Sequence, residues 1–187
     1  MMLSKNDNLE VAWHTVVHEI KRGALDKKHP FRFVVLSSIA KEKPSSRYVV
    51  LRQVDDQLGC FIYTDYRSAK IDDFQHTNAA SLLLYHPKKR AQIRMDGTVE
   101  IHREDAMALK HWEYVQGEAR KAYTSTLAPG AKIESMSDAY EWADEDYFSV
   151  LLFRPTLIEA LQLNGLEHLR ASFEWHDGHW KKSWLVP

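Results

Sequence analysis

Three side chains near residues 64–70 have the chemistry of a phosphate-binding turn. Thr64 and Ser68 supply hydroxyls and Lys70 supplies an ammonium, at the point where an apolar strand pattern gives way to a short helical one. Free backbone N–H groups at a helix N-terminus, together with the helix dipole, suit a phosphate dianion. An ordinary helix N-cap with a surface lysine explains the same residues, and the pattern alone favours that second interpretation.

Two further pairs of polar residues lie in strand-like segments. Arg47 and Arg52 flank an apolar run, and strict alternation would place them on opposite faces of one strand unless a bulge intervenes. Gln92 and Arg94 share one side of another strand and offer an amide and a planar cation. Each pair is also typical of a half-exposed polar face.

Metal and nucleophile chemistry have little support in the sequence. His14 and His18 are spaced as neighbours on one helical face, but no third ligand is evident, so we expect no metal site. Cys60 is the only cysteine, which excludes an internal disulfide, and its apolar surroundings predict a buried, inert thiol. The sequence contains no nucleophile-elbow, P-loop or dinucleotide motif.

Length and charge narrow the class of protein. A chain of 187 residues is long enough for one domain with its own core, and we expect a single domain over residues 1–187. Its 25 Lys and Arg residues against 26 Asp and Glu residues disfavour nucleic acid as a partner. The sequence lacks an apolar run long enough for a membrane span and begins without the apolar core of a secretory signal, so we expect a cytoplasmic protein that is not a membrane protein.

Hydrophobic periodicity predicts the elements that position these residues. We expect a helix over residues 8–22, a strand over 32–40 followed by a loop, a hairpin of strands 48–54 and 58–64, and a short helix over 68–78. Strands follow at 79–85 and 91–101, the second interrupted by a bulge at Asp96-Gly97.

The second half of the chain is helical first and then β. The pattern is helical from 103 to about 125, with Gly117 indicating two helices, and residues 127–146 form an irregular or partly helical acidic excursion. Strands are expected at 147–153, 156–163, 168–175 and 179–186. The whole pattern predicts a mainly β fold with peripheral helices, an antiparallel barrel with helices packed outside it.

Three segments together resemble the pyridoxamine 5'-phosphate oxidase family of split barrels that bind flavin mononucleotide (FMN). They are Arg47-Tyr48-Val49-Val50-Leu51-Arg52, the run from Phe61 to Lys70, and the run from Arg90 to Gly97. The resemblance implies an antiparallel split β-barrel of FMN-binding type, with a helical insertion at about 103–126. It also implies a homodimer with FMN at the interface, and FMN-dependent oxidation of pyridoxamine or pyridoxine 5'-phosphate.

The resemblance also implies roles for individual residues. Lys70, Ser68 and Arg47 would contact the flavin phosphate, and Arg52 and His168 would face the substrate. No catalytic residue is assigned. The full set of cofactor-binding residues that it implies is Arg47, Val50, Leu51, Arg52, Tyr63, Thr64, Ser68, Lys70, Gln92 and Arg170.

Several family positions hold other residues in this chain. Ala69 replaces an arginine, Leu161 a tryptophan, and Leu127-Ala128 a Gln-Ser pair, and the substrate-phosphate set has no clear counterpart between residues 110 and 123. The flavin contacts largely remain, whereas vitamin phosphate recognition loses most of its charge-assisted hydrogen bonds. Three hypotheses stay open. The first is an FMN-dependent oxidoreductase that acts either on the vitamin phosphates or on a changed substrate, and the second is an FMN-binding module without vitamer oxidase activity. The third is a split barrel that binds haem or a deazaflavin, with His86 or His168 as candidate ligands.

Overall fold

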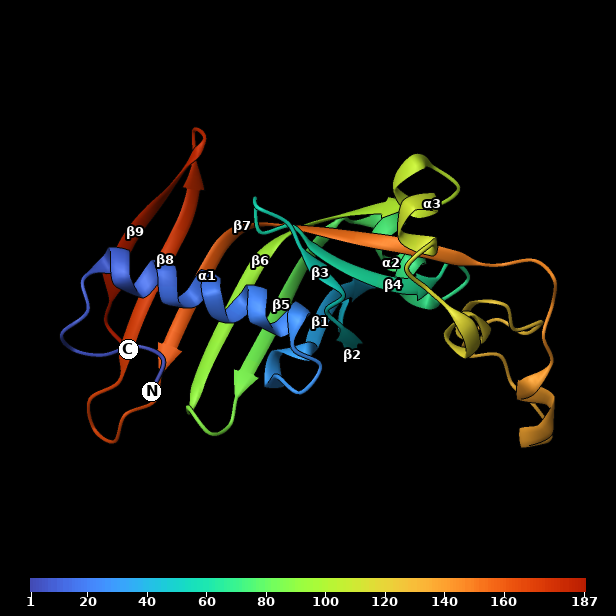
Figure 1. Cartoon of the computed structure of the whole chain (residues 1–187), viewed down its shortest axis with the longest axis horizontal. Helices are drawn as coiled ribbons and strands as arrows, with labels where there is room; N and C mark the ends of the chain where they lie inside the picture. The colour runs from blue at the N-terminus through green and yellow to red at the C-terminus, as the bar shows by residue number, and fades with distance from the viewer.

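The computed structural model describes residues 1–187, apart from the side chain of Tyr140. Nine strands form one sheet in the order β2-β1-β5-β6-β7-β4-β3, with β8 beside β7 and β9 beside β8 (Figure 1). Every named strand pair is antiparallel, so the predicted mainly β architecture is confirmed. The strands are β1 (Phe33–Ala40), β2 (Lys43–Val50), β3 (Gln53–Val54), β4 (Cys60–Asp65), β5 (Ala79–His86), β6 (Ala91–His102), β7 (Phe148–Gln162), β8 (Leu169–His176) and β9 (His179–Leu185).

The long strand β7 joins two parts of the sheet. One edge pairs with β6, while the other edge pairs first with β4 and then with β8. The two strands expected at 147–153 and 156–163 are therefore one strand, and that prediction was wrong. Pro155 does not break β7 because it lies opposite Gly97, where the register of the β6–β7 pair shifts. The predicted bulge at Asp96-Gly97 is confirmed.

A tight β1–β2 hairpin replaces the loop that we expected after residue 40. Ala40 pairs with Lys43, and the two turn residues Lys41 and Glu42 both have positive φ, at 47° and 65°. Turns of this kind match the twist of the paired strands. Because β2 ends at Val50, Arg52 does not share a strand with Arg47, and the expected strand 48–54 was wrong.

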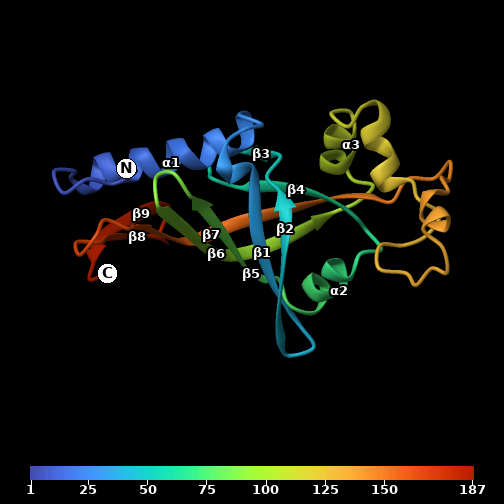
Figure 2. The ribbon, with the colours of Figure 1, turned by 90° about the horizontal axis from the view of Figure 1, so that it is seen from below.

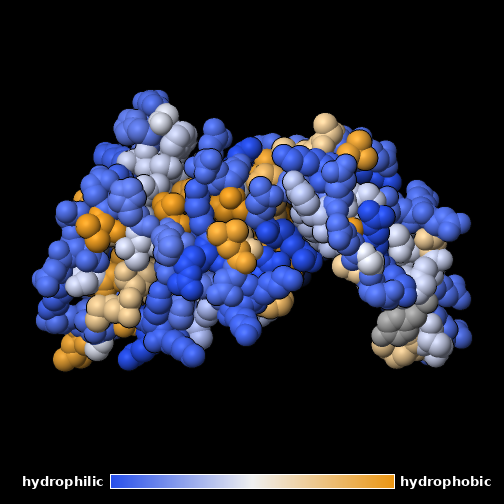
Figure 3. Space-filling model, viewed as in Figure 1, coloured by the Kyte–Doolittle hydropathy of each residue, from blue (hydrophilic) through white to orange (hydrophobic). Residues whose placement is uncertain are grey.

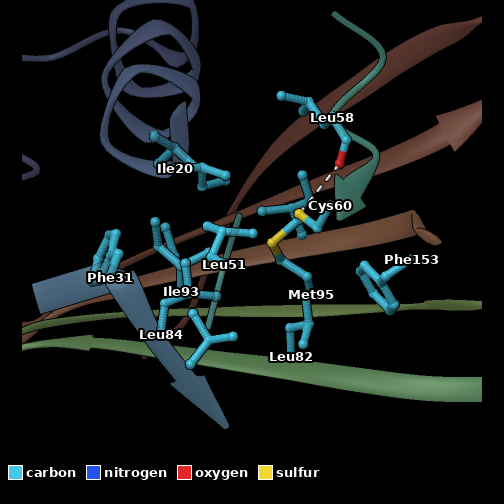
Figure 4. Packing of buried hydrophobic residues seen from close by; sticks show 14 of the residues in the cluster. Ile20, Phe31, Leu51, Leu58, Cys60, Leu82, Leu84, Ile93, Met95 and Phe153 are labelled. Atoms are coloured by element: carbon cyan, nitrogen blue, oxygen red, sulfur yellow. Dashed lines mark hydrogen bonds between the residues drawn. The ribbon is translucent and has the colours of Figure 1, made fainter. Parts of the chain in front are cut away.

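Helix α1 (Leu9–Leu25) covers the core of the sheet. The side chain of Asn8 accepts a hydrogen bond from the N–H of Val11 at 2.9 Å and so caps the helix. Ile20 of α1 lies over Leu51 and Ile93 in the buried cluster of Figure 4. Cys60 in the same cluster is buried, and burial raises the pKa of its thiol to about 12, as expected for an inert cysteine.

The remaining helices are short. They are η1 (Pro30–Arg32), α2 (Ala69–His76), α3 (Ala106–Trp112), η2 (Gly117–Tyr123) and η3 (Met136–Tyr140). Figure 2 shows α1 running along the sheet and α2 lying beside the far end of the β1–β2 hairpin. Gly117, with φ of 56°, begins η2, so the two-helix form of the predicted 103–125 region is the one present.

The insertion packs on the sheet through its own apolar cluster. Val115 and Tyr123 of the insertion lie in one buried cluster with Phe61 of β4 and Phe148 of β7, and the rings of Tyr123 and Phe148 are in contact. Among the described residues, no helix combines the length and the apolar character that a membrane span needs. The face in Figure 3 is mostly hydrophilic, with apolar residues in separate groups.

Candidate functional site

The 64–70 turn brings together the three residues that the sequence singled out. Lys70 Nζ donates to Thr64 Oγ1 at 2.8 Å and to Ser68 Oγ at 3.0 Å, and the two hydroxyl oxygens are 3.1 Å apart. Ser68 occupies the N-cap position of α2, but its side chain makes no capping hydrogen bond. The Ser68 oxygen accepts from Lys70 instead. The structure therefore differs from the ordinary N-cap with a surface lysine.

The electrostatics of this turn favour an anion. Thr64 and Ser68 are buried, and burial lowers the pKa of the half-buried Lys70. The nearby guanidinium of Arg47 lowers this pKa further, while Asp65 and Asp73 oppose the shift. An anion placed between the two cations would stabilise both charged forms.

Arg47 reaches the turn from the neighbouring hairpin. It pairs with Leu36 in the β1–β2 ladder, so its side chain lies on the same face of the sheet as the buried side of β1. It forms an ion pair with Asp73 of α2 at 3.1 Å and donates to Ser38 Oγ at 2.6 Å. Spacing along the chain does not reveal this ion pair, because Asp73 lies 26 positions away from Arg47.

The segment after β2 is held by Arg32. The N–H of Leu51 donates to the carbonyl of Arg32 at 2.9 Å, and Arg32 Nη1 donates to the carbonyl of Leu51 at 2.7 Å. The same Nη1 donates to the carbonyl of Ala24 at the end of α1. The chain between Val50 and Arg52 is therefore fixed to η1 and, through Arg32, to the end of α1.

Tyr63 and Arg52 form a second group. The guanidinium carbon of Arg52 lies 5.3 Å from the centre of the Tyr63 ring, and the Tyr63 hydroxyl lies 2.8 Å from His111 Nδ1. Burial raises the pKa of Tyr63 to about 12 and lowers the pKa of His111. Both shifts favour the neutral side chains, and the tautomer of His111 decides which of the two donates the hydrogen bond. Sequence analysis missed His111, which lies 48 positions from Tyr63.

A third group lies on the β6–β7–β8 part of the sheet. Gln92 pairs with Leu161, which pairs in turn with Arg170, so these side chains share one face. Arg170 Nη2 forms an ion pair with Glu159 at 3.0 Å. His168 is exposed before β8, and its Nδ1 accepts a hydrogen bond from the N–H of Asn164.

Figure 1 shows β8 and α2 at opposite ends of the sheet. The structure therefore places the residues implied by the resemblance in separate groups within one chain. Arg170 and His168 lie at the β8 end, whereas Ser68 and Lys70 lie at the start of α2.

One histidine cluster has the composition of a metal site but not its hydrogen bonding. Potential ligand atoms of Glu19, His29 and His86 lie within 4.8 Å of one another, and all three residues are buried. His29 Nδ1 accepts from the N–H of Phe31, and His86 Nδ1 accepts from the N–H of Lys89. A neutral imidazole whose Nδ1 accepts carries its proton on Nε2, which then cannot ligate a metal.

The cluster is better described as a buried polar network. Lys89 Nζ lies 2.7 Å from the Glu19 carboxylate, and His29 Nε2 lies 3.3 Å from the same oxygen. An ammonium at this distance would repel a metal cation. His86 is enclosed in this network, which also argues against the role of open haem ligand considered for it.

Comparison with known proteins places the chain in a family. Residues 10–103, about half of the chain, match the family described as pyridoxamine 5'-phosphate oxidase, FMN-binding domain. The chain belongs to this family. The resemblance inferred from the three sequence segments is thereby confirmed.

Individual relatives of this FMN-binding family differ in how much they share with the chain. A pyridoxine/pyridoxamine 5'-phosphate oxidase of Psychrobacter arcticus is 37% identical over 73 residues, which are 38% of this chain and 33% of that protein. The matched stretch is thus about a third of that relative's length. A pyridoxine/pyridoxamine 5'-phosphate oxidase of Gloeothece citriformis is 27% identical over 158 residues, 77% of this chain and 71% of that protein.

A solved structure confirms the fold. The crystal structure of a pyridoxamine 5'-phosphate oxidase-related, FMN binding protein from Nostoc punctiforme has a TM-score of 0.79 at 21% identity, over 100% of both chains. The predicted antiparallel split barrel is therefore the fold of this protein.

Proposed function

We propose that this protein binds FMN and acts as an FMN-dependent oxidoreductase on a small organic molecule. The observation that carries the proposal is the convergence of Thr64, Ser68 and Lys70 within 2.8–3.1 Å, with Arg47 beside them. Two hydroxyls and two cations match the phosphate monoester of FMN. Bound FMN supplies two-electron redox chemistry, and the protein orients the cofactor and its substrate.

The second group would face the flavin ring. The main chain of Val50 and Leu51 would contact the isoalloxazine, and Tyr63 and Arg52 would lie beside it. The hydrogen bonds of Arg32 to Leu51 fix this segment before any ligand binds, which reduces the entropy lost on binding. Arg52 is exposed and can also contact the substrate.

The third group supports a homodimer with FMN at the interface. Gln92 and Arg170 lie in one row across the sheet with Tyr85 and Leu161. The same face carries exposed apolar side chains in neighbouring rows, those of Phe33, Tyr48 and Leu83. A second chain on this face would cover them and could bring its own Gln92, His168 and Arg170 toward the 64–70 turn. We also propose that residues 1–187 form a single domain that works in the cytoplasm.

Binding of FMN and of riboflavin, which lacks the phosphate, tests the placement of the cofactor. Replacing both Arg47 and Lys70 with alanine removes two charge-assisted contacts, so the Kd for FMN should rise about a hundredfold while riboflavin binding changes little. Lys27→Ala, an exposed lysine outside the site, is the control. Unchanged FMN occupancy in the double variant would refute the placement, and a Soret band in place of flavin absorption would overturn the cofactor.

A second candidate function is FMN binding without oxidation of vitamin B6 phosphates. The observation in its favour is that the cations of η2 are already engaged. Arg120 Nε donates to the Val115 carbonyl at 2.8 Å and lies over the Trp112 ring, and Lys121 pairs with Glu118. Steady-state assays of the FMN-loaded protein with pyridoxamine and pyridoxine 5'-phosphate separate the two candidates. Turnover would support vitamer oxidation, and a flavin-loaded protein inert to both would support a changed substrate or a binding module.

A further inference from the structure

We infer that Asp73 is a positioning residue of the flavin phosphate site, which holds Arg47 in the orientation that receives the phosphate. This inference rests on the proposed FMN binding. Asp73 lies on α2, one helical turn after Lys70, so both side chains lie on neighbouring parts of one helix face. Its carboxylate is 10% exposed and accepts from Arg47 Nη2 at 3.1 Å.

A buried serine completes the contact. Ser38 Oγ donates to Asp73 Oδ2 at 2.6 Å and accepts from Arg47 Nη1 at 2.6 Å. A carboxylate can only accept, so the Ser38 proton must point to Asp73, which leaves the serine oxygen free to accept from Arg47. Asp73 therefore acts on the guanidinium both directly and through Ser38.

These contacts fix the guanidinium without using all of its donors. Ser38 takes one N–H of Nη1, while Asp73 and Ser45 take those of Nη2. Of the five N–H groups of an arginine, the described contacts leave Nε–H and one Nη1–H for an anion. Arg47 is thus held at one edge and available at another.

Asp73 also offsets the repulsion between the two cations before ligand binds. Arg47 lowers the pKa of Lys70, whereas Asp73 raises it. Without the carboxylate, two like charges would face each other in a half-buried site, and the flexible side chain of Arg47 would turn toward solvent. FMN would then have to order Arg47 at the moment of binding.

Two substitutions separate the geometry of Asp73 from its charge. Both bonds to Asp73 end on the same oxygen, Oδ2, so the single amide oxygen of Asp73→Asn can accept both while the negative charge is lost. Asp73→Ala removes the bonds and the charge together. The neighbouring Asp72 is exposed, and Asp72→Ala removes the same charge from the same helix as a matched control.

The experiment measures the Kd of FMN and of riboflavin for the full-length wild type and these variants, by quenching of flavin fluorescence. Asp73→Ala should raise the Kd for FMN about tenfold and leave the Kd for riboflavin unchanged. Asp73→Asn should restore FMN binding to within about threefold of wild type, and Asp72→Ala should match the wild type. If Asp73→Ala does not fold, Ser38→Ala should show the same loss that is specific for FMN.

Other outcomes overturn the inference in distinguishable ways. Equal changes in FMN and riboflavin binding, or tighter FMN binding by Asp73→Ala, would show that Asp73 does not position Arg47 for the phosphate. Failure of Asp73→Asn to restore binding would do the same. A wild type that binds FMN no better than riboflavin would overturn the proposed function itself, and this inference with it.

Discussion

Replacing Gly97 with alanine tests the bulge that joins the two longest strands. A Cβ at this position would lie 2.0 Å from the carbonyl oxygen of Arg154 and 2.9 Å from the Cα of Pro155. Both are main-chain atoms of the paired strand β7, so no side-chain rotation relieves the overlap. The strands β6 and β7 must therefore move apart at Gly97.

The expected cost is about 3 kcal/mol, the upper end of the range for overpacking, because a main chain cannot yield as a side chain does. For a chain of this length that corresponds to a fall in Tm of about 6–12 °C. FMN binding should weaken as well, because Ser149 of β7 donates to the carbonyl of Thr64 at 3.1 Å and so connects β7 to the 64–70 turn.

Thermal and urea unfolding of the purified protein measure this cost. Gly165→Ala is the matched control, because Gly165 has a positive φ of 57° and open space around its Cβ position. Its substitution should cost only the backbone strain of a left-handed residue, about 1–2 kcal/mol. A loss of stability in Gly97→Ala no larger than in Gly165→Ala would refute the steric argument.

Two further predictions concern charged groups. Lys70→Met should leave the flavin-free protein at least as stable as the wild type, because burial and Arg47 disfavour the charged ammonium, yet it should weaken FMN binding. Tm values measured with and without FMN report both effects. A lower Tm of the flavin-free variant would contradict the expected stability. Burial lowers the pKa values of His29 and His86 below the ordinary 6.5, so the folded state binds fewer protons than the unfolded state, and stability should be full above pH 6.5 and decline as the pH falls below it. Tm measured against pH checks this, and replacing both histidines with glutamine should flatten the decline.

Most of the fold could be predicted from the sequence because its signals are local. Helix α1 and the strands β4, β5 and β6 follow hydrophobic periodicity, and Gly97 marks the bulge. The β1–β2 hairpin could not be predicted in the same way, because Lys41 and Glu42 adopt positive φ without the glycine or asparagine that usually signals such a turn. Pro155 misled the prediction of β7, because its position opposite the bulge is set by a distant strand.

The candidate site divides in the same way between local and distant contacts. Thr64, Ser68 and Lys70 lie within seven positions of one another, and their spacing at a strand-to-helix turn was enough to raise the hypothesis of a phosphate-binding turn, although the pattern alone favoured an ordinary N-cap. The contacts of Arg47 with Asp73 and of Tyr63 with His111 depend on how separate elements pack. Spacing along the chain carries no information about them.

Two of the cations proposed for flavin binding, Arg47 and Arg170, share one feature that a count of charges would miss. Arg47 is paired with Asp73, and Arg170 is paired with Glu159, whose carboxylate is 14% exposed and also binds Arg94 at 2.8 Å. Each carboxylate reduces the net positive charge that a ligand meets. It also holds a side chain that carries about 2 kcal/mol of rotamer entropy when free.

An anion that binds such a prepared arginine loses less free energy to ordering but gains less from long-range attraction. Phosphate affinity at Arg47 should therefore depend on hydrogen-bond geometry more than on net charge. This agrees with a chain whose formal net charge is only −1, which offers no long-range attraction to polyanions. Weak dependence of FMN affinity on salt concentration is the consequence that separates this arrangement from a simple cluster of positive charge.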